Sequence, residues 1–230
     1  MGSYENKYWQ KNWKETKRSL SLDTKQKSVL VGSMLGDGTL QVGKGAVNAN
    51  FKTEQGLEQK KYVWWKYKIF RPWVFTPPKI SYRYTENRIK YPKSLWFRTV
   101  RHPLITKFHQ LFYRDGKKII PSNVEELLDP LALAVWIMDD GHYGKITRII
   151  DISTYCFNLE EIRLLQNAIW KRFGIAVRYH SDRDKGYRLY FNQPETSRVI
   201  SIIYPHIAPS MLYKIGFRNP VTTGSHVSYT

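Results

Sequence analysis

The stretch PLALAVWIMDDG, residues 130–141, decides the fold of this 230-residue chain. A run of uncharged residues leads directly into two aspartates and a glycine, so a helix with a buried character would end in two carboxylates. The C-terminal end of a helix carries the negative pole of its dipole, which disfavours an anion there by roughly 0.3–1 kcal/mol. Either a cation lies beside Asp139 and Asp140, or both are turn residues before a helix-ending glycine.

A second stretch, LVGSMLGDG at residues 30–38, matches LAVWIMDDG at residues 133–141 in its leucine, its aspartate and its final glycine. The two aspartates, Asp37 and Asp140, are separated by close to half the chain. The patterns that follow each stretch also match, because each half reads helix, two strands, helix, two strands, helix. This internal repeat predicts an α+β fold of two αββαββα units related by a pseudo-two-fold axis.

The repeat also predicts how the chain is divided. We place the boundary between the halves near residues 122–128, which gives a first half over 22–124 and a second half over 125–230. Residues 1–21 form a basic and aromatic N-terminal arm. The arm reads equally well as a frayed helix or as a segment that lies along a phosphate backbone through its lysines, which include Lys7, Lys11 and Lys14.

The composition indicates an anionic partner. The chain has 37 basic and 19 acidic residues, a formal net charge of +18, and 16 Tyr, 8 Trp and 10 Phe among the basic residues. A basic surplus of this size suits nucleic acid or an acidic membrane surface, and the aromatic content favours nucleic acid over a disordered basic tail. No stretch of 18 apolar residues is present, so no transmembrane helix is expected. The single cysteine excludes an internal disulfide.

A basic hairpin is expected in each half, at KISYRYTENRIKY (79–91) and AVRYHSDRDKGYRLYF (176–191). Each alternates between an apolar face and a basic or polar face, so one face covers helices and the other points outward. A twisted antiparallel sheet fits the DNA major groove, about 12 Å wide, although a plain solvated sheet face is the alternative. The candidate DNA-binding residues are Lys52, Lys79, Ser81, Arg83, Arg88, Lys90, Arg98, Lys145, Arg148, Arg178, His180, Arg183, Lys185 and Arg188.

Both motif helices carry small residues through which their backbones could approach closely. These are Gly32 with Gly36 on the first helix, and Ala132 with Val135, or Ala134 with Met138, on the second. If the two helices lie side by side about the pseudo-axis, Asp37 and Asp140 emerge together at one end.

Two adjacent carboxylates between basic sheets are a plausible site for Mg²⁺, which prefers oxygen ligands. Metals near 4 Å apart can activate water and stabilise the leaving oxygen of a phosphodiester. Because the minor groove is only about 6 Å wide, two such centres could cut both strands across it. Lys118 and Lys214 occupy similar places near the ends of the two halves, and would suit stabilisation of the transition state or polarisation of the attacking water.

The two motifs resemble those of the LAGLIDADG homing endonuclease family, of the type that carries both motifs in one chain. The likeness covers about residues 22–220, and FTPPKI, KKIIP and PSMLYK are similar to the branch found in the omega intron of yeast mitochondria. The motifs differ from the usual pattern at Ser33, Leu35, Val135 and Trp136, positions that bear on helix packing more than on chemistry.

The resemblance implies a monomeric, site-specific DNA endonuclease that places two four-stranded saddle-shaped sheets on the major groove and makes a double-strand break in a long asymmetric target. It implies that Mg²⁺, or Mn²⁺ in its place, is bound by the carboxylates of Asp37 and Asp140, each serving one strand, with help from the backbone carbonyls of Gly36 and Asp139. It further implies that Lys118 and Lys214 support the water network, and that Asp139 is a turn residue or carbonyl donor. The expected location is intracellular, in whichever compartment holds the host intron.

Two other functions remain open for the same fold. One is an RNA maturase that binds its intron, and the other is a DNA-binding protein that has lost cleavage. The presence of both Asp37 and Asp140 argues against the second. The tripeptide EQK at residues 58–60 has the acid-x-lysine pattern of restriction-type nucleases, but it lies in a helical pattern and is common by chance.

Overall fold

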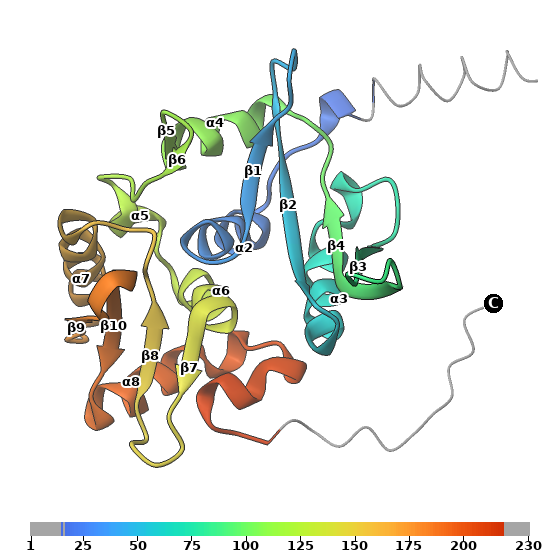
Figure 1. Ribbon diagram of the computed structural model, residues 1–230. Coiled ribbons are helices and arrows are strands. Elements are labelled where there is room, and N and C mark those ends of the chain that lie inside the picture. Colours follow the sequence, from blue (N-terminus) through green and yellow to red (C-terminus); the bar gives the residue numbers. More distant parts are fainter. Residues whose placement is uncertain (1–14, 16, 219–230) are drawn as a thin grey trace, which may run out of the picture.

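The computed structural model describes residue 15 and residues 17–218 (Figure 1). Most of the predicted N-terminal arm, including Lys7, Lys11 and Lys14, therefore lies outside the described residues.

The first half of the described chain follows the predicted order of elements, with short additions at its end. Its elements are α2 (Thr24–Leu35), β1 (Thr39–Val42), β2 (Ala49–Gly56), η1 (Leu57–Gln59), α3 (Lys60–Ile69), η2 (Arg71–Trp73), β3 (Lys79–Tyr84), β4 (Lys90–Arg98), α4 (Pro103–Phe112), the two-residue strands β5 (Tyr113–Arg114) and β6 (Lys117–Lys118), and α5 (Val124–Leu127). The sequence patterns did not predict β5, β6 or α5.

The second half repeats this order. Its elements are α6 (Pro130–Asp140), β7 (Gly141–Tyr143), β8 (Ile150–Ser153), α7 (Leu159–Phe173), β9 (Arg178–Ser181), η3 (Arg183–Lys185), β10 (Tyr187–Phe191), α8 (Gln193–Ile203), η4 (Tyr204–His206) and η5 (Pro209–Ile215). The predicted α+β fold with a duplicated αββαββα unit is confirmed. Among the described residues, no helix is long and apolar enough to span a bilayer.

The two four-stranded sheets have the same topology. Their strand orders are β1-β2-β4-β3 and β7-β8-β10-β9, and neighbouring strands are antiparallel in both. Helices α2 and α6 lie between the sheets and contact each other more extensively than any other helix pair (Figure 1). Since each sheet follows directly from one of these helices, the helix pair fixes where the sheets stand.

Both central helices begin at the residues that the sequence indicates. Asp23 caps α2 in a capping box with Gln26, and its Oδ1 accepts the Gln26 N–H at 2.7 Å. Asp129 caps α6 through the Ala132 N–H, also at 2.7 Å, with Pro130 in the first turn. A side-chain cap satisfies a backbone donor that the helix leaves unpaired.

The central helices run parallel, with backbone in contact with backbone. Ser28 bonds to Asp129 at the start of the pair, whereas a Cβ on Gly36 would lie 2.5 Å from the Cβ of Asp139 at the far end. A Cβ on Gly32, between these contacts, would lie 2.3 Å from the Ala132 carbonyl oxygen. Because the C-terminal ends of both helices lie at the same end of the pair, the residues that follow them lie close together.

We expect Gly32→Ala to destabilise the protein by at least about 2 kcal/mol, because the added methyl group meets main-chain atoms that cannot move aside. Gly56→Ala is the matched control, since a Cβ there meets nothing within 4 Å. Urea unfolding of both variants and the wild type checks this. Equal midpoints for the two variants would contradict the close approach of the helices.

Candidate active site

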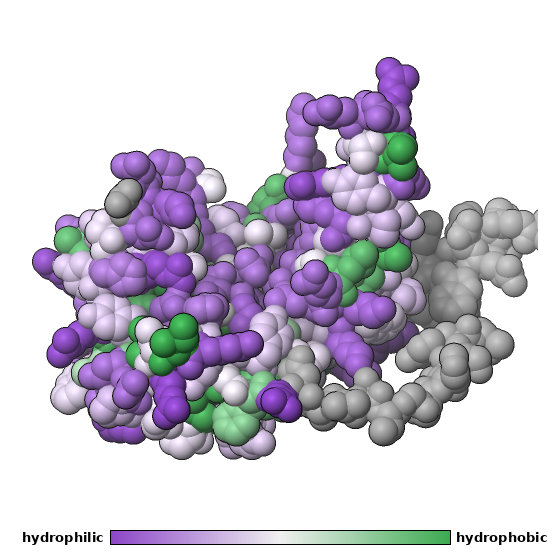
Figure 2. All heavy atoms as spheres, turned by 60° about the horizontal axis from the view of Figure 1, so that its bottom comes forward, coloured by the Kyte–Doolittle hydropathy of each residue, from purple (hydrophilic) through white to green (hydrophobic). Residues whose placement is uncertain are grey.

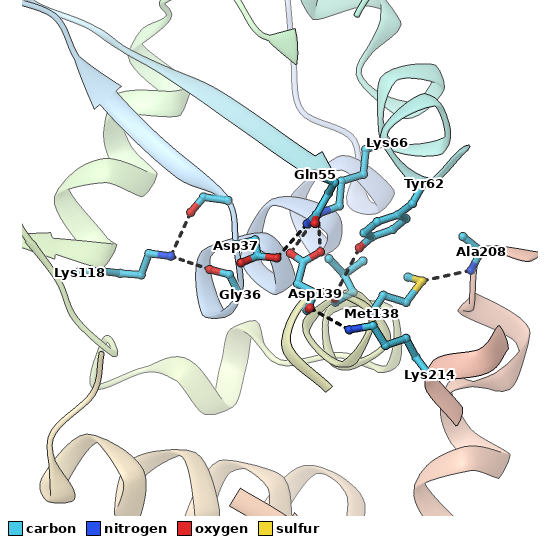
Figure 3. Close-up of polar contacts among 12 residues, drawn as sticks. Gly36, Asp37, Gln55, Tyr62, Lys66, Lys118, Met138, Asp139, Ala208 and Lys214 are labelled. Atoms are coloured by element: carbon cyan, nitrogen blue, oxygen red, sulfur yellow. Dashed lines mark hydrogen bonds and ion pairs between the residues drawn. The ribbon is translucent and has the colours of Figure 1, made fainter. Parts of the chain in front are cut away.

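The first motif aspartate is held by a neighbouring strand. Asp37 follows α2 and is exposed, and its Oδ2 accepts a hydrogen bond of 2.9 Å from Nε2 of Gln55 in β2 (Figure 3). Gln55 itself is largely buried, so its amide is held in place by the sheet. This residue was missed in the sequence, because nothing local marks one glutamine in a strand as a partner of Asp37.

The second motif aspartate is the last residue of α6 and is mostly buried. The pKa of Asp140 is raised to about 8, chiefly by burial and then by the nearby charges of Asp37 and Asp139, against the opposing effect of Lys118 and Lys214. Burial and the neighbouring carboxylates therefore both disfavour the ionised form of Asp140. A bound cation would oppose both effects and stabilise the ionised form.

The raised pKa predicts how stability varies with pH in the metal-free protein. The folded-state pKa of about 8 exceeds the ordinary value of 3.8, so the folded form binds more protons between these values and stability falls as pH rises. We expect Asp140→Asn to remove part of this loss, about 1 kcal/mol or more between about pH 5 and about pH 8, since one pKa unit is worth that much. Melting curves of both proteins in EDTA measure it, and parallel pH profiles would contradict it.

Two lysines hold the two motif ends in matching ways (Figure 3). Lys118 Nζ donates to the carbonyl oxygens of Gly36 at 2.7 Å and Gly38 at 3.0 Å, and Lys214 Nζ donates to those of Asp139 at 3.1 Å and Gly141 at 2.9 Å. Each ammonium thus bridges the residues before and after one motif aspartate. Burial lowers the pKa of both lysines, although the nearby carboxylates oppose that shift.

The donor set fits a hard divalent cation. Among the described residues, no three His, Cys, Asp or Glu side chains are arranged to hold a metal. The site instead offers the carboxylates of Asp37 and Asp140 with backbone carbonyls beside them, and these are the oxygen ligands that Mg²⁺ uses together with phosphate and water. The carbonyls of Gly36 and Asp139 already accept hydrogen bonds from lysines.

Asp139 is not a turn residue, so that alternative was wrong, whereas its expected role as a carbonyl donor stays a prediction. It lies inside α6, and its carboxylate forms a fully buried ion pair with Lys66 of α3, at 2.8 and 3.0 Å. Gly141, the residue after the end of α6, is extended rather than left-handed and begins β7, so α6 ends without the expected glycine turn. A glycine is still required there, since a Cβ would lie 2.4 Å from the Ile137 carbonyl oxygen.

Lys66 was the most informative residue that the sequence analysis missed. It lies on the buried face of α3 with Tyr62, Val63 and Tyr67, and its own side chain is completely buried. A lysine at a core position of an amphipathic helix requires a buried anionic partner. The helical spacing of these residues in KKYVWWKYKI therefore predicts a buried carboxylate partner for Lys66, but it does not identify that carboxylate.

The first sheet places most of the candidate DNA-binding residues on one face. Lys52 pairs with Arg98 across β2 and β4, and Trp96 pairs with Lys79 of β3, so all four project away from buried Phe51 and Phe97. The exposed Arg83 and the half-buried Ser81 follow Lys79 on the same face. This arrangement agrees with the predicted outward face. Glu54 pairs with Lys52 at 2.7 Å within it.

The prediction that Lys90 lies on the outward face was wrong, because Lys90 does not share that face with Arg83. The ladder between β3 and β4 shifts by one residue near Ser81, so Arg83 pairs with Tyr91 and Lys90 pairs with Tyr84. Lys90 accordingly lies 4.2 Å from the ring centroid of Tyr82, on the face predicted to be apolar. A bulge of one residue reverses every side chain beyond it, and alternation in the sequence does not reveal where it occurs.

The second sheet also presents a basic face, in which one arginine is ion-paired. Arg178, His180 and Arg188 share it, and Arg188 forms an ion pair with Asp151 of β8. Lys145 and Arg148 are exposed in the β7–β8 loop, and Arg88 and Lys185 are exposed in the tips of the two hairpins. The side chain of Arg183 lies outside what the structure describes. Figure 2 shows a face of the molecule on which hydrophilic residues predominate.

Comparison with known proteins agrees with this geometry. The model of the LAGLIDADG DNA endonuclease family matches residues 27–199, most of the chain. The chain belongs to the LAGLIDADG DNA endonuclease family. Among LAGLIDADG relatives, the cytochrome b mRNA maturase bI2 of Debaryomyces hansenii is 29% identical over 199 residues, which cover 85% of this chain and 75% of the maturase. The DNA endonuclease I-ChuI of Chlamydomonas applanata is 27% identical over 214 residues, covering 87% and 98% of the two chains.

The LAGLIDADG fold is also shared with a solved structure. The homing endonuclease I-WcaI bound to its DNA recognition sequence has a TM-score of 0.81 and 24% sequence identity, and the match covers 90% of this chain and 92% of that one. At this identity the likeness concerns the fold alone. The family resemblance that the two aspartate motifs carried in the sequence is confirmed.

Proposed function

We propose that this protein is a site-specific DNA endonuclease that cuts both strands of a long target across the minor groove and depends on a divalent metal ion. The observation that carries the proposal is the matched pair of motif ends. Each carries an aspartate whose flanking carbonyls are bonded to one partly buried lysine. Two equivalent centres in one chain suit the two strands of a duplex, so a monomer is sufficient.

Each part of the site has a role in this proposal. Asp37 and Asp140 would bind Mg²⁺, or Mn²⁺ in its place, with the carbonyls of Gly36 and Asp139 nearby. The metal would supply Lewis acidity and lower the pKa of bound water. Lys118 and Lys214 fix the backbone beside each carboxylate and place positive charge where the phosphodiester would gain negative charge. The basic sheet faces would hold the target through phosphate and base contacts.

A second candidate function is intron RNA binding. The relative from Debaryomyces hansenii is named a cytochrome b mRNA maturase, and it matches most of this chain. The two functions are compatible, since a basic surface can bind either nucleic acid. Filter binding of intron precursor RNA, in competition with duplex DNA, separates them.

Cleavage of a randomised duplex library in Mg²⁺, followed by sequencing of the ends, tests the endonuclease proposal. We expect a narrow set of cut sequences with a fixed stagger, and no cutting in EDTA. An uncut library at all metal concentrations, with DNA still bound, would favour a binding protein instead.

We expect each sheet to read the bases of a different half of the target, and this can be tested for each sheet separately. Arg83 lies on the outward face of the first sheet and Arg188 on that of the second. An arginine that contacts guanine with two hydrogen bonds contributes about 1–3 kcal/mol of discrimination, whereas a phosphate contact weakens all sequences alike. We expect each arginine-to-alanine variant to relax preference at one to three base pairs, in opposite halves of the target. Binding titrations on single-base variants measure this, and loss in the same half would exclude the arrangement.

A further inference from the structure

We propose that Lys66 is a positioning residue, whose buried ion pair with Asp139 holds the end of α6, and so Asp140, against the first half of the protein. This inference rests on the proposed endonuclease function and extends it. Lys66 is buried behind the site and is not expected to touch DNA, so its contribution would act through Asp139 and the adjoining residue.

The ion pair joins the two halves of the chain. Lys66 belongs to α3 in the first half and Asp139 to α6 in the second, and Nζ lies 2.8 and 3.0 Å from the two carboxylate oxygens. Both side chains are 0% exposed. Removing one partner from a buried pair leaves an uncompensated charge, so the two groups are strongly constrained to stay together.

The surroundings of Lys66 add to this constraint. Its Nζ lies 4.6 Å from the ring centroid of Tyr62, whose hydroxyl donates to the Val135 carbonyl at 3.4 Å, one turn earlier in α6. The last two turns of α6 are therefore each bonded to α3. In the α2–α6 contact, Asp139 lies directly against Gly36, so it has no room to move toward α2.

The constraint is present on one side of the site only. The residue that matches Asp139 in the first motif is Gly36, which has no side chain to form such a pair. Asp37 is held instead by the hydrogen bond from Gln55. Loss of the Lys66 pair would therefore displace Asp140 and leave Asp37 in place, so the two strands of a target would be affected unequally.

The test compares Lys66→Met with the double variant Lys66→Met/Asp139→Asn, which removes both charges and keeps both shapes. We expect the single variant to melt about 10 °C lower than the wild type, because Asp139 is left unpaired, and the double variant to recover most of that loss. DNA affinity should stay within about threefold for the double variant, because the phosphate contacts are untouched.

Cleavage by the double variant distinguishes positioning from stability. We expect the strand served by Asp140 to be cut about 100-fold more slowly in single-turnover reactions, the scale of a misplacement near 1 Å, so that nicked DNA accumulates. The strand served by Asp37 should be cut at close to the wild-type rate. Strand-specific end labels report the two rates separately.

Ser28→Ala is the matched control, because Ser28 bonds to Asp129 and joins the same two helices at their opposite end. It should lower the melting temperature without producing nicked DNA. Wild-type rates on both strands in the double variant, or equal slowing of both, would overturn the inference. A wild-type protein that cuts no duplex at all would instead overturn the proposed function on which the inference rests.

Discussion

Replacing either Asp37 or Asp140 with asparagine is expected to abolish double-strand cleavage in Mg²⁺, while DNA binding stays within about tenfold because it depends on many phosphate contacts. Asparagine keeps the size of the side chain and removes the charge that a metal ligand supplies. In Asp37→Asn the new amide would still lie beside the neutral side chain of Gln55, so the local structure should be preserved. Plasmid cleavage under single-turnover conditions, together with binding titrations, measures both effects.

Glu126→Gln is a suitable control for the lost charge, since Glu126 is exposed on α5. It should cut both strands at the wild-type rate. Linear product formed at the wild-type rate by either aspartate variant would show that its carboxylate is not a metal ligand. Loss of binding beyond about tenfold would show instead that the carboxylate supports the DNA-bound structure.

Replacing Lys118 or Lys214 with methionine is expected to slow cleavage by about 100-fold, the usual scale for losing one electrostatic stabiliser. Each methionine would also leave two carbonyl oxygens beside a motif aspartate without their lysine donor. The positive charge and the position of the carboxylate are therefore lost together. Single-turnover rates of both single variants and of the double variant measure the effect.

Lys117→Met is the matched control, because Lys117 is the exposed neighbour of Lys118 in the same two-residue strand. It removes the same charge at nearly the same place in the chain, and its cleavage rate should stay close to that of the wild type. Near-normal rates in the Lys118→Met/Lys214→Met variant would identify both lysines as structural.

The duplicated architecture could be predicted because each motif carries its own local signals. Asp129 before Pro130 marks the start of α6, and apolar runs that end in aspartate and glycine mark both central helices. Because the same element order occurs in both halves, the pseudo-two-fold relation between them could also be predicted. The small residues at Gly32 and Gly36 correctly indicated a close helix contact, although two faces of α6 were open and the structure selects the one with Ala132.

The parts of the site that could not be predicted depend on contacts between segments far apart in the chain. Lys66 meets Asp139 only after the two halves have folded against each other, and Gln55 meets Asp37 only after β2 has folded beside the end of α2. The bulge between β3 and β4 is equally invisible, because one extra residue in a ladder leaves the alternation of the sequence unchanged while reversing the face of Lys90.

The contact between Gly36 and Asp139 makes the two halves non-interchangeable. Copying the first half over the second would set glycine against glycine and leave Lys66 buried without a carboxylate. Copying the second half over the first would set two aspartates against each other with no room for either, since even a Cβ at Gly36 meets Asp139 at 2.5 Å. An unpaired buried charge costs several kcal/mol. The two motifs are therefore compatible only as a pair, because a substitution at position 36 or 139 restricts which residues fit at the other position.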